Sequence, residues 1–410
     1  MNNSNEFKKL NIFEDDKLNE LIYSSINYAK SLEFAKIIFY FYENVLMYAE
    51  HNEWYMFDNH IWKNIYDTNQ RSINNIIQTK LNEIYTQVYV YYYTNDNDTR
   101  KINAIRKIIC SLNNVALIKQ IISDLKLIYS NEKNKDFMKK LDANFNLLAF
   151  NNGIYDLQNF EFRNGKPEDY ISMSINYDYS ENHTEKYEEL LNFLEDILPN
   201  EPDRAYFLTY LGIALSGNKL EKIIALIGSG ANGKSRLLDL LNTALDNHVD
   251  LIPSQYFTQL QQDQTLLNLW RKRIVCTESE PDKKLNCQLI KCFLHHNSIP
   301  LRKIYSSEIL DVSFNFTPIL LCNTEPKFDN IDYTFSQHLK CINFPTQFVN
   351  NPINDNQKKR NCYIRKNFDH WKVDFMLLLI EYRKNYYKTG ELIETDNIMK
   401  LTNQCMENVH

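Results

Sequence analysis

The sequence predicts an α/β fold with a central parallel sheet, preceded by a mainly helical α+β region and followed by a helical C-terminal segment. Three observations support this class. An apolar run at 223–227 is followed by a glycine-rich loop and then by a helical pattern over 235–245, which is the strand, loop and helix order of a parallel sheet. Further short apolar runs follow it. Before it, apolar residues recur at spacings of three and four, as in amphipathic helices.

The first part of the chain is predicted to hold a polar arm and one domain. Residues 1–35 form the arm, which becomes helical over 18–30, and the domain extends over 36–180. Helical periodicity marks its first half, and short strands joined by Asn-Gly turns mark its end. The predicted helices cover 37–49, 73–93 and 100–129, and the predicted strands lie within 147–157, 160–166 and 170–179.

The second part begins with a helical linker or collar at 181–218, where two helices are separated by Pro199-Asn-Glu-Pro202. Prolines at such a place stop one helix and start the next. A nucleotide-binding domain is expected over 219–350, and a helical segment over 351–410. The predicted elements here are helices 185–198, 202–216, 285–295 and 357–387, with strands 223–227, 274–276, 318–322 and 339–344.

Composition limits the function classes. A length of 410 residues suggests two or three domains, and a net charge of −6 argues against a protein coated with basic residues for unspecific nucleic-acid binding. The most apolar early stretch, 37–49, is too short for a membrane span and carries Glu43. The eight cysteines form no Cys-x-x-Cys pair and no signal peptide precedes them. We therefore expect reduced thiols, no metal centre built on them, no membrane partner and a cytoplasmic location.

The glycine-rich loop carries the strongest chemical signal. Its residues, which fit the pattern G-x-x-x-x-G-K-[ST], are Gly228, Ser229, Gly230, Ala231, Asn232, Gly233, Lys234 and Ser235. Glycines let successive backbone N–H groups face phosphate oxygens at the start of a helix. In this pattern Lys234 reaches the β- and γ-phosphates and Ser235 is a ligand of Mg²⁺. The loop thus predicts ATP and Mg²⁺ as ligands; the alternative is a glycine turn before an ordinary helix.

An ATP-hydrolysing site also needs acids that hold Mg²⁺ through water and orient the attacking water. Glu280 is the first candidate and Glu278 the second, because both follow a short apolar strand at 274–276. Asn323 ends the strand at 318–322, where its amide could contact the γ-phosphate or the attacking water. The alternatives are an exposed acidic turn for the two glutamates and a turn-capping amide for Asn323.

Together these segments resemble the superfamily-three helicases, specifically the poxvirus-type primase-helicases and related phage and plasmid proteins. The resemblance covers about residues 36–400. It rests on the phosphate loop, the strand before Glu278 and Glu280, the segment from Lys291 to Arg302 and Lys303, and Asn323 with Pro326. Residues 52–58 with Trp62, and residues 152–157, resemble the domain that precedes the ATPase in this family.

The resemblance implies a P-loop ATPase of AAA+-like fold that forms a homo-hexameric ring and moves along single-stranded DNA at a viral replication fork. Arg302 and Lys303 would then contact DNA in the pore, although they could also be ordinary charges beside a strand. In the family a trans-acting arginine follows an Asp; this chain has Asp332 and then His338, so Lys340 or another basic residue would have to supply the charge. His295, His296 and Asn297 replace the family's Gly-Gly-Asp.

The sequence leaves three functions open. The first is a replicative helicase that relies on a separate primase, since no primase-like segment precedes residue 36. The second is a degenerate ATP-binding subunit or accessory factor with weak hydrolysis, suggested by His338 and by the early end of the chain. The third is a P-loop phosphotransferase acting on a small molecule.

Overall fold

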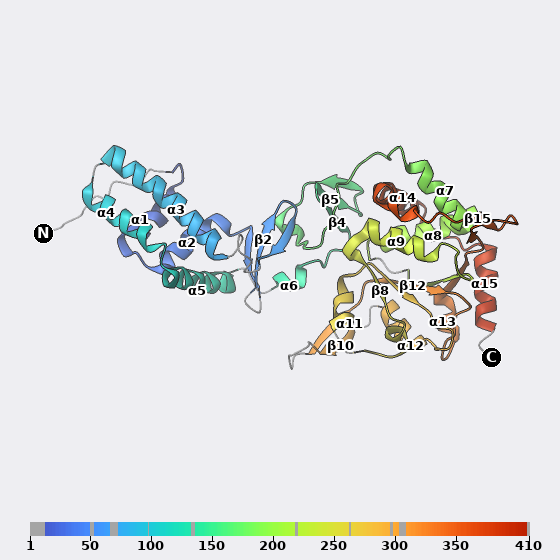
Figure 1. Cartoon of the computed structure of the whole chain (residues 1–410). Coiled ribbons are helices and arrows are strands. Elements are labelled where there is room, and N and C mark those ends of the chain that lie inside the picture. Colours follow the sequence, from blue (N-terminus) through green and yellow to red (C-terminus); the bar gives the residue numbers. More distant parts are fainter. Residues whose placement is uncertain are drawn as a thin grey trace. The chain divides into compact units, whose positions relative to one another are not determined.

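The computed structural model describes residues 13–49, 53–65, 73–96, 98–132, 136–217, 220–261, 264–295, 298–302 and 309–407. The chain divides into two compact units, and each has its own core (Figure 1). Unit 1 contains residues 1–141 and 166–172, and unit 2 contains residues 142–165 and 173–410. The domain limits expected at residues 180, 218 and 350 stay predictions.

Unit 1 is a helical unit with one small antiparallel sheet. Aromatic and aliphatic side chains from its helices bury Trp62, Tyr85 and Tyr129 almost completely. The π-helical turn Tyr92–Asp96 extends the third helix. Its helices are α1 Asp16–Tyr28, α2 Ser31–Tyr42, α3 Ile73–Tyr91, α4 Thr99–Ser111, α5 Val115–Glu132 and α6 Phe137–Lys140, and its sheet has the order β1 Leu46–Tyr48, β2 Trp54–Asp58, β3 Ile61–Asn64.

Unit 2 is built around a five-stranded sheet in which every neighbouring pair is parallel. The strand order is β13-β7-β12-β9-β8, so the strand before the glycine loop, β7, has neighbours on both sides. A second, antiparallel sheet comes earlier in the chain. The strands are β4 Leu147–Phe150, β5 Gly153–Asp156, β6 Glu161–Arg163, β7 Ile223–Ile227, β8 Val249–Ile252, β9 Ile274–Glu278, β12 Thr317–Cys322 and β13 Leu339–Asn343.

Helices cover both faces of the parallel sheet, as the near-continuous apolar strands require. Alternate residues of β7 belong to two different cores: Ile224 and Leu226 face one, while Ile223 and Ala225 face the other. The helices α8, α9 and α14 pack together over the first face (Figure 1). The helices are α7 Tyr187–Ile197, α8 Glu201–Ala214, α9 Lys234–Leu245, α10 Gln255–Thr258, α11 Gln264–Asn268, α12 Cys287–Leu294, α13 Tyr333–His338, α14 Phe368–Thr389 and α15 Asp396–Glu407.

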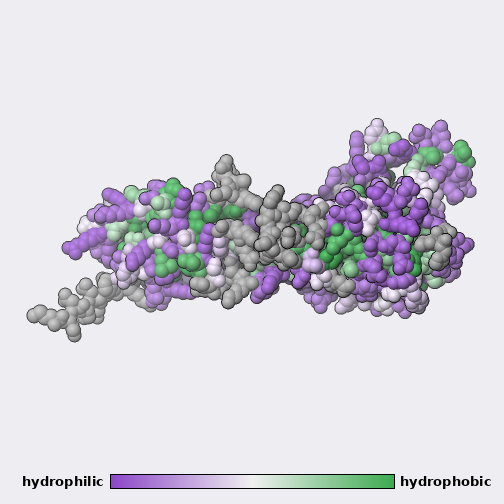
Figure 2. Space-filling model, turned by 90° about the horizontal axis from the view of Figure 1, so that it is seen from below, coloured by the Kyte–Doolittle hydropathy of each residue, from purple (hydrophilic) through white to green (hydrophobic). Residues whose placement is uncertain are grey.

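Two further strand pairs complete unit 2. β10 Ser298–Arg302 pairs antiparallel with β11 Ile309–Ser313, and β14 Gln347–Val349 pairs in parallel with β15 Gln357–Lys359. The hydrophilic and hydrophobic residues are mixed on the face shown in Figure 2, where the hydrophobic areas are small and separate. All eight cysteines lie in the described ranges and are free thiols. Within the described ranges, no single helix is both long and apolar enough to span a membrane.

Several predicted elements were wrong in their limits. The helix expected over 37–49 ends at Tyr42, because residues 46–48 pair with β2. The helix expected over 100–129 is broken after Ser111, where the Asn114 side chain accepts a hydrogen bond from the N–H of Ala116 and starts α5. Residues 170–179 contribute only an isolated bridge at Ser174. The last predicted helix, 357–387, starts later than expected at Phe368, since residues 357–359 form β15.

Candidate nucleotide site

The glycine loop leaves β7 and enters α9 through a series of left-handed backbone conformations. Gly230, Ala231 and Gly233 have φ values of 95°, 50° and 89°. A side chain at Gly228 would also collide, since its Cβ would lie 1.8 Å from Asn232 Nδ2. Glycine is therefore needed for backbone conformation at two positions and for space at a third. This geometry turns the loop tightly over the N-terminus of a 12-residue helix.

Lys234 is folded into the loop. Its ammonium donates hydrogen bonds to the carbonyl of Gly228 at 2.6 Å and to Asn232 Oδ1 at 2.9 Å, and the residue is only 5% exposed. Burial lowers the pKa of Lys234, and the nearby Glu278 opposes that effect. A buried cation surrounded by neutral oxygens is a strong attractor for a polyanion such as triphosphate. Ser235 follows in the first turn of α9 and is exposed.

The two candidate acids are in different surroundings. Glu278 is the last residue of β9 and is exposed, and its charge acts on Lys234. Glu280 instead accepts hydrogen bonds from Ser254 Oγ at 2.5 Å and from Lys283 Nζ at 2.8 Å, and these bonds lower its pKa. Glu278 therefore has the freer carboxylate of the two and acts on the loop lysine, whereas the sequence had put Glu280 first. The catalytic role of either stays a prediction.

Asn323 follows β12, the strand between β7 and β9. The N–H of Gly228 donates to the carbonyl of Cys322 at 3.0 Å, and the N–H of Ser279 donates to the carbonyl of Leu321 at 2.9 Å. The end of β12 is therefore bonded to the loop on one side and to the acidic segment on the other. Asn323 is exposed at that edge, where ligands of open α/β sheets bind.

A segment that sequence reasoning missed also supports the loop. The N–H of Phe348 in β14 donates to the carbonyl of Ala231 at 2.7 Å, and Gln347 Nε2 donates to Ser229 Oγ at 3.2 Å. The carbonyl of Phe344 lies 3.5 Å from Asn232 Nδ2. A strand of only three residues, such as β14, carries no periodic signal, so only the tertiary structure identifies it.

The residues suit magnesium brought by a nucleotide better than a resident metal. Within the described part of the chain, no group of three or more His, Cys, Asp or Glu side chains could hold a metal ion. Mg²⁺ typically keeps several waters and binds through one or two protein groups plus substrate phosphates. The Ser235 hydroxyl and, through water, Glu280, the first candidate from the sequence, or Glu278 are the groups that would hold it here.

The expected DNA-contacting segment forms an antiparallel β-ribbon of β10 and β11. Arg302 is the last residue of β10 and pairs with Ile309 through the backbone. Lys303 lies outside the described residues, as do His296 and Asn297. The DNA contacts of Arg302 and Lys303 stay a prediction.

His338 and Lys340 lie at the opposite edge of the sheet from the loop, at the start of β13. His338 is 7% exposed, and its Nδ1 lies 2.6 Å from the backbone carbonyl of Glu221. Burial lowers the pKa of His338, so its ring is neutral at pH 7. Lys340 is 8% exposed and donates to Glu394 Oε2 at 2.7 Å. Both side chains thus have partners within the same chain.

The chain is similar to a known domain family and to several viral proteins. A family model described as "D5 N terminal like" matches residues 35–199. Protein L207/L206 of Acanthamoeba polyphaga mimivirus, which carries the name of a helicase, is 30% identical to this chain over 364 residues. These residues cover 82% of this chain and 37% of that protein. Primase D5 of fowlpox virus is 29% identical over 221 residues, covering 50% of this chain and 28% of that protein.

Among solved structures, the apo C-terminal region of NrS-1 is similar over 56% of this chain and 53% of that one, with 13% identity and a TM-score of 0.43. The chain spans about a third of the length of the curated relatives it matches. Because the family model and the viral helicase and primase relatives agree, the chain belongs to the D5-type primase-helicase family.

Proposed function

We propose that the chain is an ATP-dependent DNA helicase of superfamily three that acts in DNA replication. The observation that carries the proposal is the loop at 228–235, which holds the buried ammonium of Lys234 at the carboxyl edge of the sheet, with the charge of Glu278 acting on it. Lys234 is placed to stabilise charge on the β- and γ-phosphates during phosphoryl transfer.

The other side chains at this edge have distinct roles in the proposal. The backbone N–H groups of the loop and the N-terminus of α9 bind phosphate oxygens, and Ser235 is a Mg²⁺ ligand. Glu278 orients the attacking water and accepts its proton, because its carboxylate is exposed and hydrogen-bonds to no other described residue. Asn323 contacts the γ-phosphate from the neighbouring strand.

The topology supports a P-loop ATPase of AAA+-like architecture. The glycine loop follows the first strand of the five, and that strand lies between the last strand, β13, and the fourth, β12. The connection after β7 runs to β8 at one end of the sheet, whereas the connection after β12 runs past β7 to β13 at the other end. This change in the direction of the connections makes the carboxyl edge at β7 a topological switch point, where α/β proteins bind ligands.

DNA would be held by a homo-hexameric ring of these subunits. Arg302 and Lys303 would contact the phosphates of a single strand, so that repeated copies supply positive charge despite a chain net charge of −6. A separate primase, a replication fork and a cytoplasmic site of viral replication complete this proposal.

A second candidate is favoured by His338 and Lys340. In an active ring, a cation from one subunit reaches the nucleotide of the next. Here both side chains are buried, and His338 is neutral. A subunit that binds ATP and assembles, but needs a partner's cation for rapid hydrolysis, would fit this observation.

Strand separation on a forked DNA duplex tests the proposal. The purified chain should separate the strands with ATP and Mg²⁺ and fail with a non-hydrolysable ATP analogue, and Lys234→Ala should abolish the activity. Lys359→Ala, an exposed lysine on β15, is the control and should keep it. ATP binding without strand separation, even on forks, would favour the second candidate.

A further inference from the structure

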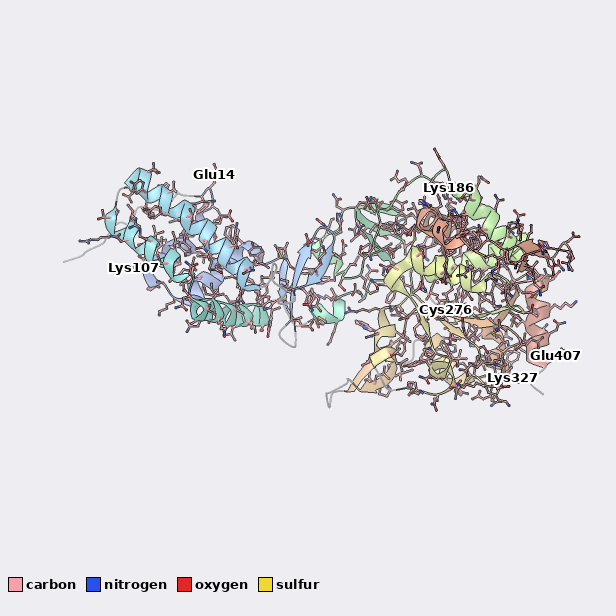
Figure 3. The ribbon with its side chains drawn as sticks, in the orientation of Figure 1. Glu14, Lys107, Lys186, Cys276, Lys327 and Glu407 are labelled. Carbon is pink, nitrogen blue, oxygen red and sulfur yellow. The ribbon has the colours of Figure 1, made fainter. Side chains whose placement is uncertain are left out.

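A cavity of about 370 Å³ lies next to the glycine loop. Its walls come from the turn between α7 and α8, the carboxyl end of β13 and the inner side of α15. Glu407 marks the C-terminal end of α15 in Figure 3. The volume falls in the range of small-molecule sites, and the residues that line the cavity all belong to unit 2.

Two residues that line the cavity directly follow residues that lie against the glycine loop or the end of β7. Leu198 lines the cavity and follows Ile197, whose Cγ2 lies 2.3 Å from the position of a Cβ at Gly233. Pro345 lines it too and follows Phe344, whose N–H donates to the carbonyl of Ile227 at 2.7 Å. The cavity therefore opens within one residue of groups that contact the loop.

The direction of a bound nucleotide follows from the strand order. Glu278 and Asn323 lie at the ends of β9 and β12, on one side of β7, so the terminal phosphate lies on that side. The chain of phosphates crosses the loop, and the rest of the molecule must leave on the opposite side. The strand there is β13, whose end forms the cavity wall with Asn343.

The lining has the chemistry of a nucleobase site. Leu198, Pro199 and Pro345 offer apolar surface for the faces of a planar ring. Asn343 and Gln404 offer amides that both donate and accept, and neither forms a hydrogen bond with another side chain in the described ranges. A base presents donors and acceptors along its edge, so amides can match it without a net charge.

The carboxylate that lines this cavity, Asp203, already has hydrogen-bond partners in the chain. Asp203 accepts hydrogen bonds from Thr395 Oγ1 and from Asn397 Nδ2, the latter at 3.1 Å, and is only 8% exposed. These bonds fix the start of α15 against α8. Lys400, the other charged residue of the lining, is exposed. With the Asp203 carboxylate already paired, the remaining polar lining consists mainly of amides and this lysine, which favours a neutral base over a cationic ligand.

We infer that this cavity binds the nucleoside part of the ATP whose phosphates the loop holds, and that α15 supplies the base-contacting side chains. The inference rests on the proposed nucleotide site at 228–235 and extends it to residues that the loop pattern does not include. It makes the C-terminal helix part of the nucleotide site.

Calorimetric titration with two ligands tests the inference, and Mg²⁺ is present throughout. ATP carries phosphates and nucleoside, whereas inorganic tripolyphosphate carries only phosphates. Gln404→Ala and Asn343→Ala should each weaken ATP binding by roughly three- to tenfold, the effect of one lost hydrogen bond, and leave tripolyphosphate binding unchanged. Gln404→Trp, which fills the cavity, should weaken ATP further and again spare tripolyphosphate.

Asn403→Ala is the matched control, because Asn403 is an exposed neighbour on α15 that does not line the cavity. It should bind both ligands like the wild type. If the wild type binds ATP no better than tripolyphosphate, or if all three cavity variants bind ATP normally, the inference is wrong while the loop assignment stands. If Lys234→Ala keeps full affinity for both ligands, the proposed nucleotide site itself fails.

Discussion

The two edges of the parallel sheet differ in how their polar side chains are used. At the carboxyl edge, Glu278, Asn323 and Ser235 are exposed. At the amino edge, by contrast, His338 and Arg273 are buried and hydrogen-bonded to backbone carbonyls. The polar groups at the carboxyl edge are therefore available to a ligand, whereas those at the amino edge form hydrogen bonds that stabilise the fold.

Within one sheet, the side chains of one edge are thus placed to bind a ligand, and those of the other edge stabilise the fold. Arg273 lies just before β9 and donates to the carbonyls of Phe145 at 2.5 Å, Leu147 at 2.7 Å and Leu215. It fixes the segment leading into the antiparallel sheet to the parallel one. Cys276 of the same strand lies inside the unit, whereas Lys327, beyond β12, is at the surface (Figure 3). The exposed polar side chains at the carboxyl edge are therefore the stronger candidates for catalysis.

The largest expected effect is on turnover at the carboxyl edge. Glu278→Gln keeps the shape of the side chain but removes its basicity, so ATP hydrolysis should fall by roughly 10²- to 10⁴-fold. Glu280→Gln is the matched control and should change the rate little, because that carboxylate is bonded to Ser254 and Lys283. Steady-state phosphate release measures both. A larger loss in Glu280→Gln than in Glu278→Gln would contradict the assignment.

At the amino edge the largest effect should be on stability. Arg273→Ala leaves the buried carbonyls of Phe145, Leu147 and Leu215 without their donor, which should cost about 3 kcal/mol in free energy of unfolding of unit 2. Urea denaturation followed by circular dichroism measures this. Arg236→Ala removes a half-exposed pair with Asp239 and should cost less than about 1 kcal/mol. Equal losses would show that Arg273 does not fix the fold.

The amino edge should also make stability sensitive to pH. His248, just before β8, is fully buried, and burial followed by the charges of Arg273 and Lys272 lowers its pKa far below the usual value. The unfolded chain binds a proton below about pH 6.5 that the folded chain does not, so the free energy of unfolding falls as pH decreases, by at most about 1.4 kcal/mol per unit.

His248→Gln should flatten this dependence between about pH 6.5 and 5, the interval below the unfolded pKa of histidine. Denaturation midpoints of the two proteins across that interval give the comparison. The same slope in both would mean that His248 is not the group responsible.

The smallest effect is expected at His338. His338→Gln loses one hydrogen bond to the carbonyl of Glu221 and should cost about 1 kcal/mol of stability. Its rate of DNA-stimulated ATP hydrolysis should match that of the wild type, since the ring is neutral and buried. A rate loss of several orders of magnitude, as for an arginine finger, would place His338 in catalysis instead.

Much of the carboxyl edge could be predicted because its signals are local. The apolar run, three glycines and the following helix lie within residues 223–245. Glu278 ends one short apolar strand, and Asn323 directly follows another. The choice between Glu278 and Glu280 could not be predicted. It rests on two hydrogen bonds to Glu280, one from the nearby Lys283 and one from Ser254, which is 26 residues away along the chain.

The amino edge gave no comparable signal. Arg273 bonds to residues up to 128 positions away, so no spacing in the sequence indicates its role. The strand β8 was missed for a related reason: its four residues include the charged Asp250, and its strand character depends on pairing with β9. Likewise β1 was hidden by a helical pattern that extends past the true end of α2.

Hydrolysis of ATP by the purified chain, with and without single-stranded DNA, tests the central claim most directly. Lys234→Ala is measured beside the wild type, with Lys359→Ala as the lysine control. We predict hydrolysis that rises with DNA, disappears in Lys234→Ala and persists in Lys359→Ala. Hydrolysis that is indifferent to DNA, or that survives in Lys234→Ala, would contradict the account of this chain as a DNA-dependent motor built on the loop at 228–235.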